Sequence, residues 1–334
     1  MRSTISVMQK KYHWQKSLTD LITDPKELFN LLDLDHRLLP MAYQATEMFP
    51  LKVTRQFVTR MQKGNPKDPL LLQVLPLGFE LDQHSGYVFD PLKELKMNPL
   101  PGLLHKYHGR VLVTLTGACA VHCRYCFRRN FPYEENNPGK MGWKKIIHYI
   151  KQDETIHEVI LSGGDPLSAS DALLQAFTDQ LKEVPHVKRL RIHTRLPIVL
   201  PERITTSLIH WISNLHLKAI VVVHVNHPQE INQEVSDALN LLCEAKILLL
   251  NQTVLLKDIN DQAETLISLS ETLFASSVLP YYLHVLDKVH GACHFDIPLD
   301  KAHALHQSLS HHLPGYLVPK LVREDPGEPA KTLI

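Results

Sequence analysis

The sequence has little glycine, few cysteines and no long apolar run. Its 334 residues include 13 glycines and five cysteines, and no segment approaches the roughly 20 apolar residues that a transmembrane helix needs. The formal net charge of +1 gives no electrostatic reason to expect binding to nucleic acid or to an acidic membrane surface. We therefore expect neither a nucleic-acid partner nor a membrane partner.

The cysteines are odd in number and clustered. Three of the five, Cys119, Cys123 and Cys126, follow one another closely, which argues against the disulfide framework of a small secreted protein. The N-terminal segment 1–17 also lacks the continuous apolar core of a secretory signal. We expect a protein of the reducing cytoplasm.

The chain changes character near residue 100. Prolines divide residues 1–100 into short pieces, one of which starts with Asp24, Pro25 and Glu27 as a helix does. We expect an N-terminal helical subdomain there. Beyond it, apolar β-branched runs alternate with helical periodicity. The expected strands span 110–117, 158–163, 189–194, 219–225, 247–256 and 279–286, and the expected helices span 142–152, 168–183, 201–215, 229–245, 261–276 and 299–312.

Six βα units in a row predict an α/β fold with a parallel sheet and right-handed crossovers over residues 101–334. Ser168 and Asp171 suggest a capping box, and Pro201 and Pro228 suggest helix starts. Periodicity does not decide whether the sheet closes into a barrel, but in either case functional groups gather where strands end. The candidate groups do follow predicted strands: the cysteine loop, Gly163-Gly164-Asp165, Arg195, Asn226-His227 and Asp287.

The loop 119–126 offers three thiols at a C-x3-C-x2-C spacing. A four-iron cluster normally takes four thiolates, so three would leave one iron open to another ligand. Two alternatives stay open from the spacing alone: zinc with His122 as fourth ligand, and an electron-transfer cluster completed by Cys243 or Cys293. Without such a role, Cys243 is expected to pack in an apolar helix.

This spacing resembles the signature loop of the radical S-adenosylmethionine enzymes, and further motifs resemble their lysine 2,3-aminomutase group. The motifs are Asp90-Pro91-Leu92, Arg110-Val111-Leu112, Cys126-Phe127-Arg128-Arg129, Ser162-Gly163-Gly164-Asp165, Asn226-His227-Pro228 and the segment 251–257. The resemblance implies a partial (β/α)6 radical-SAM barrel. It also implies three cofactors: a [4Fe-4S] cluster, S-adenosyl-L-methionine and pyridoxal 5'-phosphate.

The resemblance assigns roles residue by residue. Lys331 would hold pyridoxal phosphate as a Schiff base and act in catalysis, and Arg128 would pair with the substrate carboxylate. Asp287 would bind a substrate ammonium group, with Glu324 or Asp325 as a second acid. The remaining assignments are Cys119, Cys123 and Cys126 for the cluster, Arg110 and Tyr107 for pyridoxal phosphate, and Gly163, Gly164, Asp165 and Gln252 for S-adenosylmethionine.

The implied reaction moves the α-amino group of L-lysine from C2 to C3 and needs an electron donor protein. Degradative members of the group carry a C-terminal extension with a zinc site, whereas this chain stops at Ile334 and has Gln262 in place of a zinc-ligating cysteine. We therefore expect no zinc, doubt the same tetramer and allow a homodimer. The short form is similar to the branch that makes (R)-β-lysine for elongation factor P. The alternatives are a degradative enzyme, an aminomutase of another amino acid, and a zinc or ferredoxin-like protein.

Overall fold

The computed structural model describes residues 13–82 and 84–334, so most of the segment tested for a secretory signal lies outside it. Nine strands pair side by side in chain order to form one sheet. The strands are β1 (Leu103–Tyr107), β2 (Arg110–Thr114), β3 (Glu158–Ser162), β4 (Arg189–Thr194), β5 (Lys218–Val223), β6 (Leu248–Val254), β7 (Leu279–His284), β8 (Lys320–Arg323) and β9 (Thr332–Leu333).

Strands β2 to β8 are parallel, and each edge carries one antiparallel strand, β1 on β2 and β9 on β8. The six predicted strands are confirmed to within a few residues. The three strands that the sequence did not reveal are β1, β8 and β9. They have two to five residues each, too few to show a period, and most of them carry charged or polar side chains.

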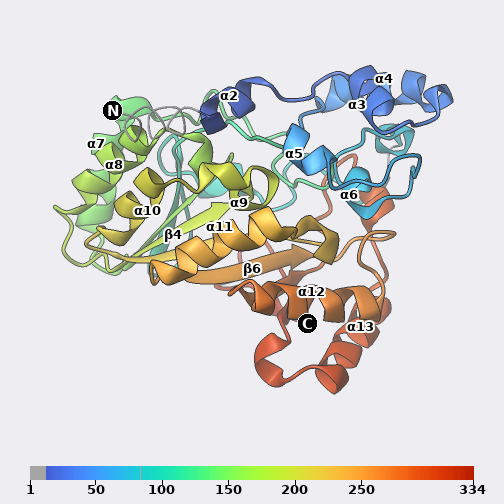
Figure 1. Cartoon of the computed structure of the whole chain (residues 1–334). Helices are drawn as coiled ribbons and strands as arrows, with labels where there is room; N and C mark the ends of the chain where they lie inside the picture. Colours follow the sequence, from blue (N-terminus) through green and yellow to red (C-terminus); the bar gives the residue numbers. More distant parts are fainter. Residues whose placement is uncertain (1–12, 83) are drawn as a thin grey trace, which may run out of the picture.

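The helices cover the outside of the sheet, while shorter N-terminal helices run across one end of it (Figure 1). The outer helices are α7 (Gly139–Gln152), α8 (Asp171–Leu181), α9 (Leu196–Val199), α10 (Thr206–Ser213), α11 (Gln233–Glu244), α12 (Ala263–Ala275) and α13 (Leu299–His312). The N-terminal helices are α2 (His13–Thr19), α3 (Pro25–Leu31), α4 (Leu39–Met48), α5 (Arg55–Val58) and α6 (Pro69–Leu72). No helix in the described ranges combines the length and the apolar character needed to cross a bilayer.

Several predicted helix starts were wrong. Pro201 and Pro228 each begin a single 3-10 turn, and helices α10 and α11 start five residues later behind the caps Thr205 and Asn232. The cap of α8 is Ser170 rather than Ser168. Proline fits the first residue of a 3-10 turn as well as that of an α-helix. Its presence therefore did not show which of the two begins at that residue. In contrast, Asp24 does cap α3, accepting from the backbone N–H of Lys26.

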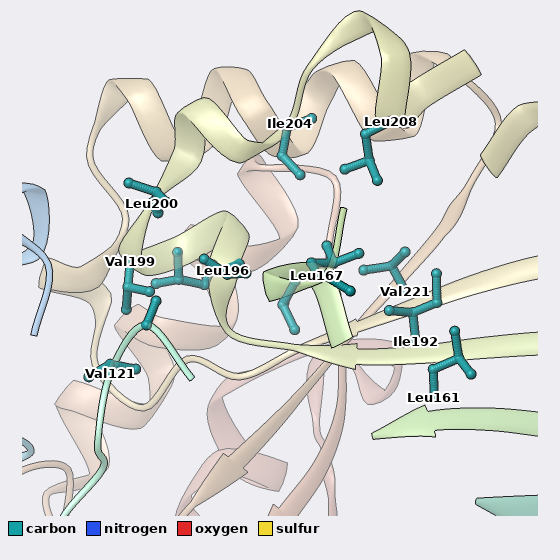
Figure 2. Close-up of a cluster of buried hydrophobic side chains, with 14 of the residues drawn as sticks. Val121, Leu161, Leu167, Ile192, Leu196, Val199, Leu200, Ile204, Leu208 and Val221 are labelled. Atoms are coloured by element: carbon teal, nitrogen blue, oxygen red, sulfur yellow. The ribbon is translucent and has the colours of Figure 1, made fainter. Parts of the chain in front are cut away.

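One buried cluster runs from the N-terminal helices into the sheet. Trp14, Phe29 and Phe57 belong to the same cluster as the apolar side chains of β2 to β6. Figure 2 shows part of it, where Val121 of the cysteine loop lies near Val199 of α9. The cysteine loop is therefore anchored on the core. The division at residue 100 stays a prediction.

Cys243 does not pack as expected. It lies on the exposed side of α11. The apolar residues Leu239 and Leu242 of the same helix are buried instead, because they face the sheet while Cys243 does not.

Candidate active site

A cavity of about 1010 Å³ lies inside the curve of the sheet and among the loops that follow the strands. Alternate residues of β4 to β7 face it, as expected for one face of a pleated sheet. Thirteen of the fourteen predicted site residues line this cavity; they are Tyr107, Arg110, Cys119, Cys123, Cys126, Arg128, Gly163, Gly164, Asp165, Gln252, Asp287, Glu324 and Lys331. Residues as far apart in the chain as Tyr107 and Lys331 thus share one site, and Asp325 is the exception.

The cysteine loop is held by the N-terminal segment. The backbone N–H of His122 donates to Lys52 O at 2.8 Å, and that of Arg124 donates to Gln73 O at 2.9 Å. The Arg124 guanidinium is fully buried and pairs with Glu80 through two bonds of 2.8 and 2.6 Å. Glu80 also accepts from Arg129. These pairs fix the backbone on either side of Tyr125, between the second and third cysteines.

The three thiols are free and partly exposed to the cavity. Burial, followed by the neighbouring Cys123, raises the pKa of Cys126 to about 11, and burial also raises the pKa of Cys119. The Cys119 and Cys126 thiols therefore resist ionisation in the ligand-free protein. Bound iron would reverse that preference, because a metal ion stabilises the thiolates that ligate it. The donor set fits an iron–sulfur cluster with one open iron.

Among residues 13–82 and 84–334, no three Cys, His, Asp or Glu side chains converge on a single-ion site. A four-iron cluster needs a different arrangement of its ligands. Its cysteines ligate separate irons of a cage, so the three thiols need only surround a common space on one loop.

The glycine pair lies close against the segment before Cys119. A Cβ on Gly164 would lie 2.6 Å from backbone atoms of Gly117 and Ala118. Gly163 has φ of +111°, a conformation that side chains disfavour. The Asp165 carboxylate is already engaged, because it accepts from Thr194, Leu167, Arg195 and Leu196. The residues available to a ligand here are therefore backbone groups rather than that carboxylate.

A buried polar layer lies beneath the cysteine loop. The Arg195 guanidinium donates to Cys123 Sγ at 2.7 Å and to Glu230 Oε2 at 3.0 Å. The Tyr125 hydroxyl lies 2.8 Å from His224 Nε2 and accepts from Asn226 Nδ2 at 2.7 Å. Arg195 and Asn226 were expected at the site because they follow β4 and β5. Both donate to the Tyr125 hydroxyl and to Gln73 Oε1, and these shared bonds order the cysteine loop.

Lys331 lies in the hairpin between β8 and β9, and its amine is bonded to Glu324. Lys106 Nζ bonds the other oxygen of Glu324 at 2.5 Å. Asp325 turns away: its carboxylate accepts from Thr332 and Arg323 at 2.7 and 2.8 Å. Of the two acids left open by the sequence, the structure brings Glu324 to the cavity and uses Asp325 to close the hairpin.

Asp287 faces the same end of the cavity. Burial, and then the nearby Glu324, raises the pKa of Asp287 to about 7, although Lys331 and Lys106 oppose the shift. Within the described ranges no cation lies in ion-pair contact with it. A buried acid in this state gains most from a cationic ligand.

Arg110 also lines the cavity, with its guanidinium over the Tyr107 ring at 4.6 Å. Arg128, which lines the same cavity, is paired with Glu94 and donates to Ser162. Glu94, Lys106 and Glu80 were missed from the sequence. Of the three, only Glu94 had a signal in the sequence, because it closely follows the Asp90-Pro91-Leu92 motif. The other two looked like ordinary surface charges, since their partners lie far away in the chain.

Comparison with known proteins agrees with this site. Residues 113–269, which include the cysteine loop and the glycine pair, match the Radical SAM superfamily. The solved structures that match include Streptococcus suis SuiB bound to S-adenosylmethionine, at 14% identity and a TM-score of 0.48, covering 70% of this chain and 53% of that one. The superfamily match, which spans the cysteine loop and the glycine pair, identifies this site as that of a radical SAM protein.

Relatives of nearly equal length narrow the family. The chain is 48% identical to the L-lysine 2,3-aminomutase of Escherichia coli K12, covering 96% of this chain and 93% of that one, and 46% identical to that of Haemophilus influenzae Rd, covering 98% and 97%. Identity to the L-lysine 2,3-aminomutase of Clostridium subterminale is 34%, over 96% of this chain and 77% of that one. The chain belongs to the lysine 2,3-aminomutase family, whose cofactors are a [4Fe-4S] cluster, S-adenosylmethionine and pyridoxal phosphate. The simple zinc and ferredoxin-like alternatives are therefore wrong.

Proposed function

We propose that this enzyme is an L-lysine 2,3-aminomutase, which moves the α-amino group of L-lysine from C2 to C3 and gives β-lysine. The observation that carries the proposal is the charge arrangement of the cavity. Arg128 shares the cavity with the acids Asp287 and Glu324 and with Lys331. The ion pairs of Glu94 and Lys106 stand between Arg128 and Glu324. A substrate with a carboxylate at one end and an ammonium at the other matches this arrangement, as lysine does.

Three sets of residues would hold the cofactors. Cys119, Cys123 and Cys126 would ligate the cluster, and Gly163, Gly164, Asp165 and Gln252 would contact S-adenosylmethionine, the first three through their backbone. Lys331 would hold pyridoxal phosphate covalently, with Arg110 on its phosphate and Tyr107 beside it. When bound, the cluster and S-adenosylmethionine supply a 5'-deoxyadenosyl radical, and pyridoxal phosphate supplies the conjugated group that stabilises the substrate radical.

The protein's own residues would orient the substrate. Arg128 would bind the α-carboxylate with the N–H groups that Glu94 leaves free, and Asp287 would bind the distal ammonium. Glu324 would join Asp287 once Lys331 has left it for the cofactor. Burial makes these charges selective, because a neutral substrate would leave Asp287 desolvated and unpaired.

A finer proposal concerns the product. The chain covers 93% and 97% of relatives that are 48% and 46% identical, but only 77% of the Clostridium relative at 34% identity. The higher identity to the first two relatives supports the branch that makes (R)-β-lysine for elongation factor P, over the degradative branch. We further propose a reducing cytoplasmic setting, which the five free cysteines support, with an electron donor protein and a homodimer as partners.

A comparison of substrates tests the proposed function. Protein loaded anaerobically with cluster, pyridoxal phosphate and S-adenosylmethionine is reduced and offered L-lysine, L-ornithine and L-norleucine in parallel. We expect a β-amino acid from lysine, much less from the shorter ornithine, and none from norleucine, which lacks the distal ammonium. Equal turnover of norleucine would contradict the assignment of Asp287 and Glu324.

A further inference from the structure

Arg128 is held by a buried glutamate that no recognised motif contains. Arg128 Nε donates to Glu94 Oε2 at 2.7 Å and Nη2 donates to Oε1 at 2.8 Å, with side-chain exposures of 9% and 2%. Such a two-bond pair fixes the plane of the guanidinium as well as its charge. Burial alone would raise the pKa of Glu94, but Arg128 and then Lys106 hold that pKa below its ordinary value. Glu94 is therefore ionised at neutral pH.

The pairing leaves part of the guanidinium available. Of its five N–H donors, two go to Glu94 and one, on Nη1, goes to Ser162 Oγ at 3.1 Å. In the described part of the chain the remaining donors, one on each terminal nitrogen, meet no acceptor. Because Arg128 lines the cavity, these two donors suit the two oxygens of a substrate carboxylate.

Glu94 also connects Arg128 to the acid that holds Lys331. Lys106 Nζ lies 3.2 Å from Glu94 Oε1 and 2.5 Å from Glu324 Oε1, and Glu324 in turn binds Lys331. Five side chains of alternating charge thus form one chain of ion pairs from Arg128 to Lys331. Without Glu94, both Arg128 and Lys106 would lose an anionic partner in a buried setting, which is costly.

We propose that Glu94 is a positioning residue that sets both ends of the substrate site. It fixes Arg128 for the α-carboxylate, and through Lys106 it holds Glu324 in place for the distal ammonium. This inference rests on the proposed function only in taking Arg128 and Glu324 as the groups that meet the two charged ends of lysine.

Kinetics of Glu94→Gln test the role. We expect KM for L-lysine to rise on the order of 10- to 100-fold, with kcat within a few-fold and with iron, sulfide and pyridoxal contents unchanged. The preference for L-lysine over L-lysinamide, which lacks the carboxylate, should shrink. The matched control is Glu154→Gln, which removes an exposed carboxylate before β3 and should change neither value. An unchanged KM in Glu94→Gln would overturn the proposal.

A structural measurement decides the same point without turnover. In a ligand-free crystal structure of Glu94→Gln, we expect the Arg128 guanidinium to leave its present position and Lys106 to lie against Glu324 alone. An unmoved Arg128 would overturn the proposal. Wild-type protein that makes no β-lysine would refute the proposed function instead, and the crystal structure would still decide the role of Glu94.

Glu94→Asp serves where Glu94→Gln fails to fold, because it keeps the buried charge but shortens the side chain by one methylene. We expect a smaller rise in KM and loss of one of the two bonds to Arg128. Wild-type KM together with an unmoved guanidinium would again count against the proposal.

Discussion

Lys106 of β1 and Glu324, which follows β8, form an ion pair of 2.5 Å between residues 218 positions apart. Their strands lie at or next to opposite edges of the sheet, whose order runs from β1 to β9 without pairing between these two in the described residues. Side chains therefore bridge the open side of the partial barrel, and they do so inside the cavity. The same carboxylate holds Lys331, so the bridge and the cofactor lysine depend on each other.

Replacing Lys331 should abolish covalent binding of pyridoxal phosphate without affecting the iron–sulfur cluster. We expect Lys331→Ala to lose the absorbance of covalently bound pyridoxal phosphate and on the order of 10³-fold in activity, while its iron and sulfide contents stay at the wild-type level. Absorbance spectra and metal analysis measure both. Lys320→Ala, an exposed lysine of β8, is the control. Retained pyridoxal absorbance in Lys331→Ala would show that another lysine carries the cofactor.

The cysteine loop alone should hold the cluster. Cys123→Ala should bind little iron and sulfide and give no cluster EPR signal after reduction, because two thiolates replace three. Cys243→Ser, on the exposed side of α11, should reconstitute normally. A full cluster in Cys123→Ala would mean that the ligands are misassigned.

Ionisation of Asp287 should make kcat/KM for L-lysine depend on pH. Only its ionised form attracts the substrate ammonium, and burial raises its pKa in the ligand-free protein to about 7. As pH falls below 7, kcat/KM for lysine should therefore decline, approaching tenfold per pH unit. Asp287→Asn should show a low kcat/KM that no longer responds to this titration, with cluster and pyridoxal spectra intact. A variant with wild-type kcat/KM would refute the role of Asp287.

Glu80 should matter for stability rather than for substrate binding. Glu80→Gln leaves Arg124 and Arg129 buried without their shared carboxylate, which we expect to lower the free energy of unfolding by about 3–5 kcal/mol. Anaerobic urea denaturation measures this, with Glu154→Gln as the exposed control. A loss under 1 kcal/mol would show that the N-terminal segment contributes little to holding the loop.

The sequence predicted the parallel strands and the cavity residues well because both depend on local signals. Runs of apolar, aromatic or β-branched residues mark β2 to β7, and polar residues at the ends of these strands gather at one edge of any parallel sheet. All three cysteines, the glycine pair and Lys331 accordingly lie in one cavity. The roles of these residues were predicted from the resemblance to the aminomutase group. Composition and spacing alone did not predict them.

What the sequence could not show was pairing over long distances. Glu94 with Arg128, Glu80 with Arg124, and Lys106 with Glu324 join separate parts of the chain, and no local pattern distinguishes such residues from solvated surface charges. The choice between Glu324 and Asp325 stayed open for a related reason. Neighbours in a hairpin point to opposite sides, and only the pairing of β8 with β9 shows which one faces the cavity.

The most direct test of the central claim follows the migrating nitrogen. L-Lysine carrying ¹³C at C2 and ¹⁵N at the α-amino group is incubated anaerobically with reduced, fully loaded protein, and the products are resolved by NMR and chiral chromatography. The account predicts (R)-β-lysine in which the ¹⁵N has left the labelled carbon for C3. Unchanged lysine from protein that contains both cluster and pyridoxal phosphate would contradict it.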